Sequence, residues 1–339
     1  MRIITFFIGA ILLFSGCDEG KNPDPQSFTI EPGNMMLATN EGNFRSGNAT
    51  ASLYHFIRNE WLDDGFKTFN NRSLGDVCHS ATFWNGNVFL VVNNSGKIEV
   101  VNPNTFVSAQ TISGFVSPRY LLPVSPTKAY VTDIYANKVY IVSGFPLSIT
   151  GEIPLHGWAE EMVLENGKVW VVNKSRPVVH IIDAQTDVLT DSMLLPAIPT
   201  SIAKGKGGGL WIGQQAIGAE RPRILFVAAG AKSILNSVES PYSMSPPDRF
   251  VSSVTGDSVF FINGNPSMLV NHNMVFTWTT FVAPTGNWYG LGWDAKRQLL
   301  VASDAADYNQ KSNIWMSYLG ANYQTTRKGG IITSHFYFY

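Results

Sequence analysis

The stretch Ala129–Ser143, AYVTDIYANKVYIVS, predicts two β-strands joined by a tight turn, and it decides the fold of the chain. Apolar Val131, Val139 and Ile141 alternate with residues that face a neighbouring layer, as the period of two in a pleated strand requires. Asn137, in the connection, suits a short hairpin turn. Because the same pair of strands recurs along the chain, the pattern indicates a repeat architecture rather than a single hairpin.

Seven segments match the first strand of this pair. They are Met35–Asn40, Val88–Asn93, Ala129–Ile134, Val169–Lys174, Leu210–Gln215, Val259–Gly264 and Leu299–Asp304. Their spacing of roughly 40–50 residues is close to the period of a four-stranded propeller blade, and further short apolar segments supply four strands per unit. The first unit lacks an innermost strand, whereas the C-terminal Gly330–Tyr339 matches one. We therefore predict an all-β, seven-bladed β-propeller over residues 35–339, closed by the C-terminal strand pairing into the N-terminal blade.

The composition favours a β protein that does not bind nucleic acid. Val, Ile, Tyr, Phe and Trp are frequent, and 45% of the 339 residues are hydrophobic, which is enough for a large core. The formal net charge is −1 and no basic block occurs, whereas nucleic-acid binding requires clustered cations. We therefore expect no nucleic-acid partner.

The first sixteen residues resemble a bacterial lipoprotein signal peptide. Arg2 precedes an apolar run, Ile3–Phe14, that is too short to span a bilayer, and Ser15, Gly16 and Cys17 follow it. In lipoproteins the Cys becomes the acylated N-terminus. We expect residues 1–16 to be removed and Cys17 to carry the lipid, which would attach the protein to a membrane. An ordinary secretory signal with an incidental Cys is the alternative.

The stretch after Cys17 has the composition of a tether. Residues 17–34 are polar and contain three prolines, which predicts an extended segment between the lipid and the fold. The other cysteine, Cys78, is expected to be a free thiol buried in a strand, because no disulfide framework is possible.

The repeat residues resemble a known family. AYVTDIYANKVYIVSG from residue 129 and VWVVNKSRPVVHIIDAQTDVL from residue 169 are similar to the YVTN-type β-propeller repeat. LATNEGNF at Leu37–Phe44, VVNNSGKIEVVN at Val91–Asn102 and GWAEEM at Gly157–Met162 resemble surface lipoproteins of the Bacteroidetes group, a family that includes cobalamin-capturing propellers. The resemblance implies a lipid-anchored, outer-membrane protein that takes a corrinoid ligand and passes it to a TonB-dependent transporter.

The residues after Cys17 bear on the membrane leaflet. Asp18 and Glu19 resemble the acidic export signal of surface lipoproteins in that group, which favours the cell surface. The periplasmic face is the alternative, since in enterobacteria an Asp at this place favours retention at the inner membrane.

Polar and aromatic residues gather in the loops after the second strand of each unit and in the loops that enter the innermost strand. Both sets of loops lie on one face of a propeller, around its central channel, so we predict a ligand site there. The candidate ligand-binding residues are Asn40, Asn93, Asn94, Arg119, Tyr120, Asp133, Tyr135, Trp158, Glu160, Asn173, Gln214, Arg249, Trp288, Tyr289 and Asp304. For a corrinoid, Trp158 or Tyr289 would stack on the ligand. Arg119 and Arg249 would meet its phosphate.

Several of these residues also have a structural explanation. Asn and Asp at strand ends commonly bond their own backbone in turns. Trp170, Trp211, Trp293 and Trp315 lie inside strands and are expected to pack between blades. The glycine-rich Lys204–Gly209 precedes a strand instead of opening a helix, so we expect a turn rather than a phosphate site.

Signals for enzymatic activity are sparse. The chain has no GxSxG, HExxH or CxxC motif and its six His show no metal-ligand spacing, so we predict no catalytic residue, cofactor or metal. Three functional hypotheses remain. The first is ligand capture, and the second is a protein–protein scaffold at the cell surface. The third is a lactonase-type hydrolase whose metal would be held by Glu160, Asn173 and Asp304.

Overall fold

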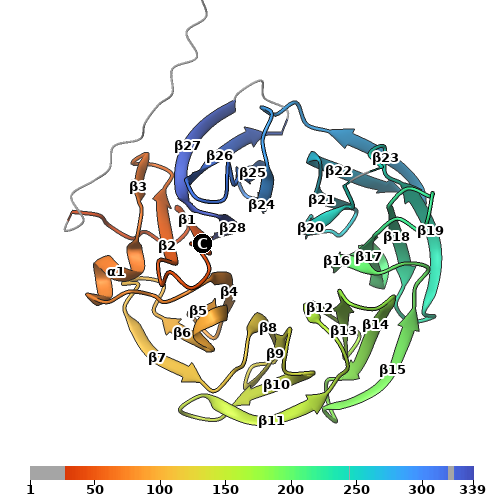
Figure 1. Ribbon diagram of the computed structural model, residues 1–339, viewed down its shortest axis with the longest axis horizontal. Helices are drawn as coiled ribbons and strands as arrows, with labels where there is room; N and C mark the ends of the chain where they lie inside the picture. Colours follow the sequence, from red (N-terminus) through yellow and green to blue (C-terminus); the bar gives the residue numbers. More distant parts are fainter. Residues whose placement is uncertain (1–26, 244, 320–323) are drawn as a thin grey trace, which may run out of the picture.

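Antiparallel β-sheets arranged in a ring around a central opening make up nearly all of the regular structure (Figure 1). The computed structural model describes residues 27–243, 245–319 and 324–339. The predicted signal peptide, Cys17 and most of the predicted tether therefore lie outside the described residues. Within the described part of the chain, no helix is both long enough and apolar enough to cross a membrane.

Five of the sheets contain four strands each, ordered along the chain from the centre of the ring outward (Figure 1). They are β4 (Cys78–Trp84), β5 (Asn87–Val92), β6 (Lys97–Val101) and β7 (Ser108–Ser113); β8 (Pro118–Ser125), β9 (Lys128–Asp133), β10 (Lys138–Ser143) and β11 (Ser148–Pro154); β12 (Ala159–Glu165), β13 (Lys168–Asn173), β14 (Val178–Asp183) and β15 (Val188–Leu194); β16 (Pro199–Lys204), β17 (Gly209–Gln214), β18 (Arg223–Ala228) and β19 (Ser233–Glu239); and β20 (Asp248–Ser252), β21 (Ser258–Asn263), β22 (Asn265–His272) and β23 (Val275–Thr280).

The sixth sheet has eight strands in the order β27-β26-β25-β24-β28-β1-β2-β3 and contains both ends of the fold. Its strands are β1 (Met35–Asn40), β2 (Thr50–His55), β3 (Glu60–Leu62), β24 (Trp288–Asp294), β25 (Leu299–Asp304), β26 (Lys311–Tyr318), β27 (Gln324–Ile331) and β28 (Thr333–Phe338). The C-terminal β28 pairs antiparallel with β1, whereas one parallel residue pair, Leu291 with His335, joins it to β24. Repeated four-stranded sheets set around one opening define a β-propeller.

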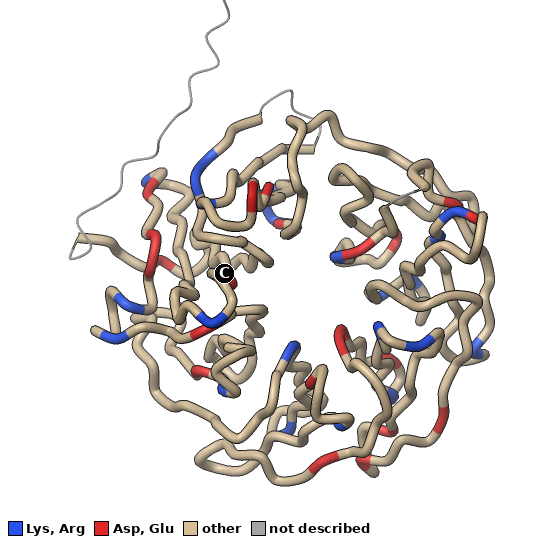
Figure 2. The backbone as a smooth tube through the Cα atoms, in the orientation of Figure 1, with Lys and Arg blue, Asp and Glu red and all other residues tan. Residues whose placement is uncertain are grey.

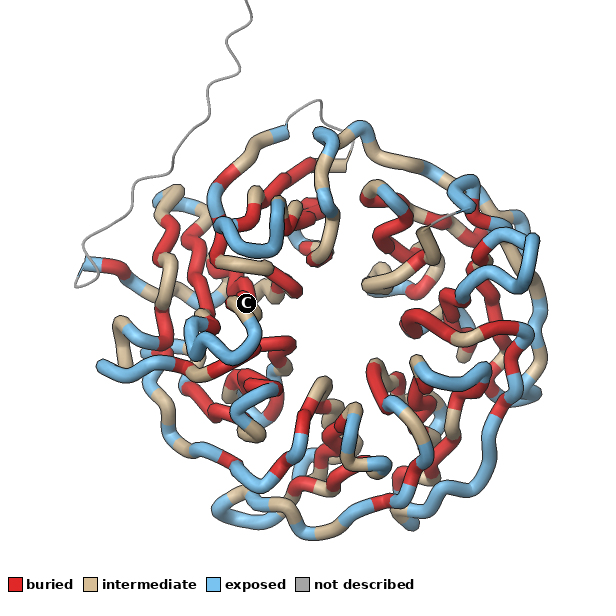
Figure 3. The backbone as a smooth tube through the Cα atoms, viewed as in Figure 1, coloured by how far each residue is buried: buried red, intermediate tan, exposed pale blue. Residues whose placement is uncertain are grey.

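The hairpin from which the prediction began is β9 and β10, and its alternation has a physical cause. Val131 belongs to a core cluster with Phe89 and Val91 of the preceding sheet, whereas Tyr130 packs with Val169 of the following sheet. Both faces of each sheet are thus buried against neighbours, which explains why these strands are almost continuously apolar. Figure 3 shows this buried inner part and the more exposed outer strands.

The innermost strands carry a bulge near their first residues. Register shifts occur between Cys78 and Ser80, Pro118 and Leu121, Ala159 and Met162, Pro199 and Ser201, Asp248 and Val251, and Trp288 and Gly290. A bulge bends the strand and changes the direction in which the side chains beside it point. Here it turns polar side chains toward the central opening. We call this face, where innermost strands begin and second strands end, the mouth.

Two local features differ from the simple repeat. A short helix, α1 (Gly65–Asn70), lies between β3 and β4 and buries Phe66, while the Asp64 carboxylate accepts a hydrogen bond from the Lys67 N–H at 3.0 Å. This helix was not predicted, because six residues are too few to show a helical period. The predicted turn at Lys204–Gly209 is confirmed. It contains a short 3-10 helix, η2 (Lys206–Gly208), and β17 begins directly after it at Gly209.

The described end of the predicted tether contacts the fold. Phe28 is buried in the core cluster that includes Met35 and Leu53. The Glu31 carboxylate lies 2.9 Å from Arg58, which follows β2. Residues 27–34 therefore pack against the first strands of the ring, and the extended tether predicted for residues 17–34 is not seen in this part.

Candidate functional site

Ionisable side chains from most of the sheets meet at the mouth. Most belong to the first residues of innermost strands, and Glu41 and Lys174 belong to loops after second strands. We call this set the central cluster, and it consists of Glu41, His79, Arg119, Tyr120, Glu160, Glu161, Lys174, Asp248, Arg249, Tyr289 and His335. Figure 2 shows charged residues of both signs at the inner edge of the ring, and others spread over its outer parts.

One side of the central cluster is organised by Glu41. Its Oε1 lies 2.9 Å from His79 Nδ1, and the Tyr289 hydroxyl donates to both carboxylate oxygens at 3.1 Å. Burial, assisted by the positive charges of Arg119 and Arg249, lowers the pKa of His79 well below its usual range. Burial also raises the pKa of Tyr289 to about 12. Both groups are therefore neutral near pH 7, and Glu41 is held by two uncharged partners.

The hydrogen bonds of His335 fix its tautomer. Its Nδ1 lies 2.9 Å from the backbone oxygen of His79, which can only accept, so Nδ1 carries the proton. Burial and the charge of Arg249 lower the pKa of His335 well below its usual range. In this neutral ring Nε2 is an acceptor, and it faces Arg249 Nη1 at 3.3 Å and the Tyr120 hydroxyl at 3.5 Å.

The opposite side of the central cluster is centred on Lys174. Its ammonium lies 3.4 Å from both Glu161 Oε1 and Asp248 Oδ1, and the Ser201 hydroxyl also reaches Glu161 Oε1. Burial raises the pKa of the Glu161 carboxyl, although Lys174 opposes the shift. Glu161 Oε2 is buried and has no hydrogen-bond partner among the described residues.

The two arginines of the central cluster differ in their partners. Arg119 Nε donates to Glu160 Oε2 at 2.9 Å, so this guanidinium is neutralised within the protein. Arg249 instead lies over the ring of Tyr289, 4.5 Å from its centroid, and bonds neutral His335. None of the ion pairs formed among the described residues involves Arg249. Its backbone has a φ of 59°, a left-handed value that a residue with a side chain adopts only at some cost in energy.

Two cavities meet at Arg249. One, of about 300 Å³, extends into the channel between innermost strands and is lined by Tyr120, Glu161, Ser201 and His335. The other, of about 440 Å³, opens beside the channel and is lined by Asp248, Trp288, Tyr289 and Tyr308. We call this second cavity the mouth pocket. It combines three aromatic side chains with a guanidinium and a carboxylate, a set that suits a partly aromatic or amphipathic ligand.

The strand-end amides and carboxylates among the predicted residues bond nearby loops. Asp133 Oδ2, for example, accepts the N–H groups of Val116 and Ser117 at 3.1 and 2.6 Å. In the same way Asn40 bonds Thr50, Ser52, Gly330 and Thr333, Asn93 bonds Ser117 and Pro118, Asn94 bonds Asp76, Asn173 bonds His156 and Ser175, and Asp304 bonds Asn287 and Asn313. Gln214 is buried, and its Oε1 has no partner among the described residues. These side chains stabilise the loops that shape the mouth.

The predicted aromatic residues fall into two places. Trp288 and Tyr289 line the mouth pocket, and Trp288 also packs edge to face against Trp315. Tyr135 and Trp158 are 63% and 49% exposed and lie edge to face with ring centroids 6.5 Å apart. Trp170, Trp211 and Trp315 are buried and Trp293 stacks on Phe260 of the neighbouring sheet, so the expectation of inter-blade packing is confirmed.

The central cluster thus contains five of the predicted residues, Arg119, Tyr120, Glu160, Arg249 and Tyr289, and a sixth, Trp288, lies beside it in the mouth pocket. Six members of the central cluster were not among the predicted ligand-binding residues: Glu41, His79, Glu161, Lys174, Asp248 and His335. All of these residues except Asp248 lie in loops that the repeat pattern predicts at the mouth, so their place was predictable, although they were not chosen as ligand-binding residues.

The described residues contain no group of three or more His, Cys, Asp or Glu side chains placed to hold a metal ion. The three residues of the lactonase hypothesis each bond their own chain: Glu160 pairs with Arg119, Asn173 bonds the His156 carbonyl, and Asp304 accepts from Asn287. Cys78 is buried as predicted, and burial raises the pKa of its thiol far above the usual range. A neutral, enclosed thiol is a poor nucleophile.

A family model described as "Domain of unknown function (DUF5074)" matches residues 34–284, and the chain belongs to this family. No curated protein matches the chain. The matched residues include the first strand, β1, and most of the central cluster.

Many solved structures are similar in fold. A quinonprotein alcohol dehydrogenase-like protein from Bacteroides thetaiotaomicron has a TM-score of 0.69 at 14% identity, covering 92% of this chain and 79% of that one. The Swd1 β-propeller domain of Myceliophteria thermophila has a TM-score of 0.61 at 12% identity over 75% and 88% of the two chains. Hydrazine synthase from Kuenenia stuttgartiensis has a TM-score of 0.59 at 13% identity over 70% and 75%. At such identities these likenesses show the β-propeller fold alone.

Proposed function

We propose that this protein binds a small molecule at the mouth and that Arg249 holds an anionic group of that ligand. The unpaired guanidinium of Arg249 carries the proposal. Arg119 and Lys174 each lie within 4 Å of a carboxylate. Arg249 directly contacts neutral His335 and the Tyr289 ring, and the charges of Asp248 and Glu41 act on it from a longer distance. Arg249 is half-buried and has no carboxylate of the described residues within 4 Å, so a ligand carboxylate or phosphate could form a close, charge-assisted hydrogen bond with it.

The proposal includes a seven-bladed ring. The eight-stranded sheet divides into β24 to β27 and the group β28-β1-β2-β3, which one residue pair connects. Counting these as two blades gives seven with the five separate sheets, and the pairing of β28 with β1 closes the ring. Closure would fix the separation of residues that reach the central cluster from different sheets.

A corrinoid such as cobalamin is the ligand that we propose to test first. The support comes from the resemblance to cobalamin-capturing surface lipoproteins and from the chemistry of the mouth pocket. Its aromatic residues Trp288, Tyr289 and Tyr308 offer contact area for a macrocycle, and Arg249 offers a partner for the phosphodiester of the nucleotide loop. The pocket is open, so a ligand larger than its 440 Å³ would extend over the mouth.

In this proposal the protein captures its ligand without chemical conversion. Lipid attached to Cys17 would hold it at the outer membrane, at the cell surface. The bound corrinoid would then pass to a TonB-dependent transporter in the same membrane.

Calorimetric titration with cyanocobalamin and with cobinamide tests the ligand and the role of Arg249 together. Cobinamide retains the corrin ring but lacks the nucleotide loop and its phosphate. We expect the wild-type protein to bind cobalamin more tightly than cobinamide. Arg249→Gln should weaken cobalamin binding about 10- to 100-fold, because a charged hydrogen bond is lost, while cobinamide affinity changes little.

The matched control is Arg58→Gln, which removes an exposed guanidinium from the turn after β2, on the face opposite to the mouth. This variant should bind both compounds as the wild type does. Absence of heat with both corrinoids at tens of micromolar would reject the corrinoid ligand. Equal losses for cobalamin and cobinamide in Arg249→Gln would show that this residue does not recognise the phosphate.

A protein partner is the second candidate function, and the exposed pair Tyr135 and Trp158 favours it. Large aromatic side chains that remain exposed commonly mark contact surfaces. If the mouth serves a protein, Trp158→Ala should abolish co-purification of that partner while corrinoid titrations give no heat.

A further inference from the structure

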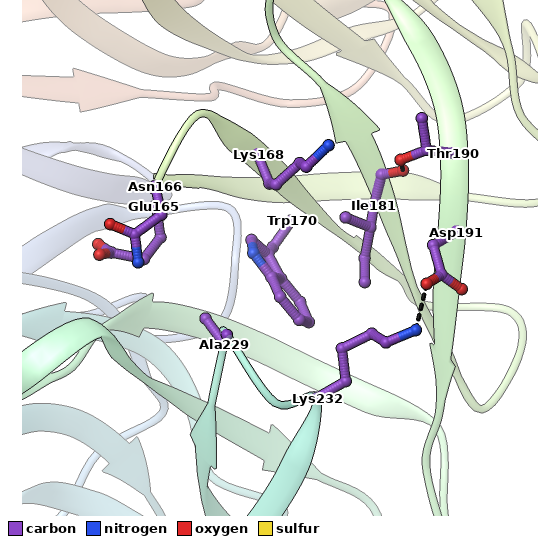
Figure 4. Close-up of a pocket in the computed structure, with 10 residues that line it drawn as sticks. Glu165, Asn166, Lys168, Trp170, Ile181, Thr190, Asp191, Ala229 and Lys232 are labelled. Atoms are coloured by element: carbon purple, nitrogen blue, oxygen red, sulfur yellow. Dashed lines mark hydrogen bonds and ion pairs between the residues drawn. The ribbon is translucent and has the colours of Figure 1, made fainter.

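A separate groove lies between the sheets β12–β15 and β16–β19 (Figure 4). Its volume is about 470 Å³, within the range of about 300–1,000 Å³ typical of small-molecule sites. The turn Glu165–Lys168 forms one wall and the turn around Ala229 and Lys232 forms another, with Trp170 and Ile181 between them. We call it the interblade groove.

The interblade groove is remote from the mouth. The turn at Glu165–Lys168 joins the end of β12 to the start of β13, whereas Glu160 and Glu161 of the central cluster lie at the beginning of β12. Ala229 and Lys232 likewise follow β18, at the end opposite to the mouth. A ligand in the groove would therefore not compete with one at the mouth.

The indole N–H of Trp170 lacks an acceptor. Trp170 is 2% exposed, and its Nε1 has no hydrogen-bond partner among the described residues. The corresponding Trp211 of the next sheet donates its indole N–H to the Gly256 carbonyl at 3.1 Å. In Figure 4 the nitrogen-bearing edge of Trp170 faces Glu165 and Asn166. A buried donor without an acceptor is costly, and a ligand oxygen in the groove would satisfy it.

The groove exists because small side chains stand where the next interface has aromatic rings. The residue paired with Trp211 in register is Phe226, and its ring centroid is 4.8 Å from that of Trp211. Phe276 of the following sheet packs on the same indole at 5.6 Å. The residue paired with Trp170 is Ile181, which leaves the space beside the indole unfilled.

The charges around the interblade groove are neutralised within the protein. Lys232 pairs with Asp191 across the two sheets, Lys168 lies 2.6 Å from Asp183, and Lys204 lies 3.9 Å from Glu165. An ionic ligand would have to disrupt these pairs. A neutral ligand with many hydroxyl groups could instead accept from Trp170 and donate to Glu165, with Asn166 and Thr190 available as further partners.

We propose that the interblade groove binds a neutral sugar residue. The sugar would accept a hydrogen bond from Trp170 Nε1, donate a hydroxyl to Glu165, and place its apolar face against the Trp170 and Ile181 side chains. This proposal is independent of the ligand at the mouth.

Saturation-transfer NMR on the full chain tests this site with methyl glycosides of glucose, galactose, mannose and N-acetylglucosamine, each at up to about 50 mM. We expect transfer to at least one glycoside. Ile181→Phe, which introduces the ring present at Phe226, should abolish that transfer. Trp170→Phe, which removes only the N–H donor, should weaken affinity about three- to tenfold.

Trp211→Phe is the matched control, because its indole N–H already has an acceptor in a filled interface. Glycoside binding should survive in this variant. Corrinoid titrations of Ile181→Phe, compared with the wild type, separate the groove from the mouth. If Ile181→Phe fails to fold, Thr190→Val on the rim replaces it as the second variant. No transfer to any glycoside, or unchanged binding in the groove variants, would overturn the proposal.

Discussion

Glu99 is a fully buried carboxylate that is surrounded by hydrogen-bond donors. Arg72 donates to it at 2.9 Å, Lys97 at 2.7 Å, and the hydroxyls of Ser108 and Thr111 complete the shell. Burial alone would raise the pKa of Glu99, but hydrogen bonds from Arg72, Lys97 and Ser108 lower it to about 2. Arg72 follows α1, so the carboxylate also ties the helical insertion to β6.

Glu99→Gln should therefore destabilise the fold in a pH-dependent way. The folded pKa lies below the ordinary value of 4.5, so this carboxylate contributes stability above that pH and loses it as pH falls toward 2. At pH 7 we expect the variant to lose about 3 kcal/mol in the free energy of unfolding. Urea unfolding at pH 7, 4 and 3 measures this loss, which should shrink with falling pH.

Glu152→Gln is the control for this experiment, because Glu152 pairs with Lys138 at an exposed site. An exposed ion pair contributes at most about 1 kcal/mol, so this variant should resemble the wild type at every pH. A loss in Glu99→Gln that is the same at pH 7 and pH 3 would show that Glu99 acts through packing rather than charge.

At the scale of single residues, the sequence predicted which residues lie at the mouth, but it did not distinguish the roles of the individual residues there. It could place Arg249 and Tyr289 at the channel, because the starts of innermost strands follow from the repeat. It could not tell that Arg119 is neutralised by Glu160 while Arg249 is not, since these contacts join different sheets. The interblade groove could not be predicted from the sequence either, because it depends on Ile181 occupying the position that Phe226 occupies in the next sheet.

At the scale of elements the prediction was most successful for strands with two buried faces. β1 and β25 have the bounds predicted from the repeat, and β9 and β10 form the hairpin from which the repeat was inferred. The helix α1 was missed because six residues give too short a pattern. The innermost strand predicted at Gly330–Tyr339 begins only at Thr333, because Gly330 and Ile331 belong to the preceding strand, β27.

The C-terminal strand β28 provides a test at this scale. It pairs with all but the first residue of β1, and the Met35 N–H donates to the Tyr339 carbonyl at 2.9 Å. Deleting residues 330–339 would expose the apolar side chains of Met36 and Ala38, which pack in the cluster with Phe336. We expect the truncated chain to lose its cooperative thermal transition, measured by circular dichroism. A transition near the full-length midpoint would contradict closure of the ring by β28.

At the scale of the whole molecule, the proposed function depends on attachment to a membrane. A single acyl chain binds membranes only weakly, whereas the multiple acyl chains of a processed lipoprotein anchor a protein stably. Cys17→Ala should therefore move the protein from the membrane to the soluble fraction and abolish labelling by an alkyne analogue of palmitate. Cys78→Ala is the control, because this thiol is buried and should carry no lipid. Unchanged labelling in Cys17→Ala would reject the proposed anchor.

The pairing of β28 with β1 also has a consequence for biosynthesis. Met36 of β1 pairs with Phe338 of β28. The sheet that contains β1 is therefore complete only when β28, far along the chain, has been synthesised. Contacts between such distant residues slow folding, because a long loop must close before they form. Until then the edge of β1 is unpaired and open to aggregation. The sheet is therefore completed only after β28 has been synthesised, and a chaperone that shields the N-terminal strands until then would raise the yield of folded protein.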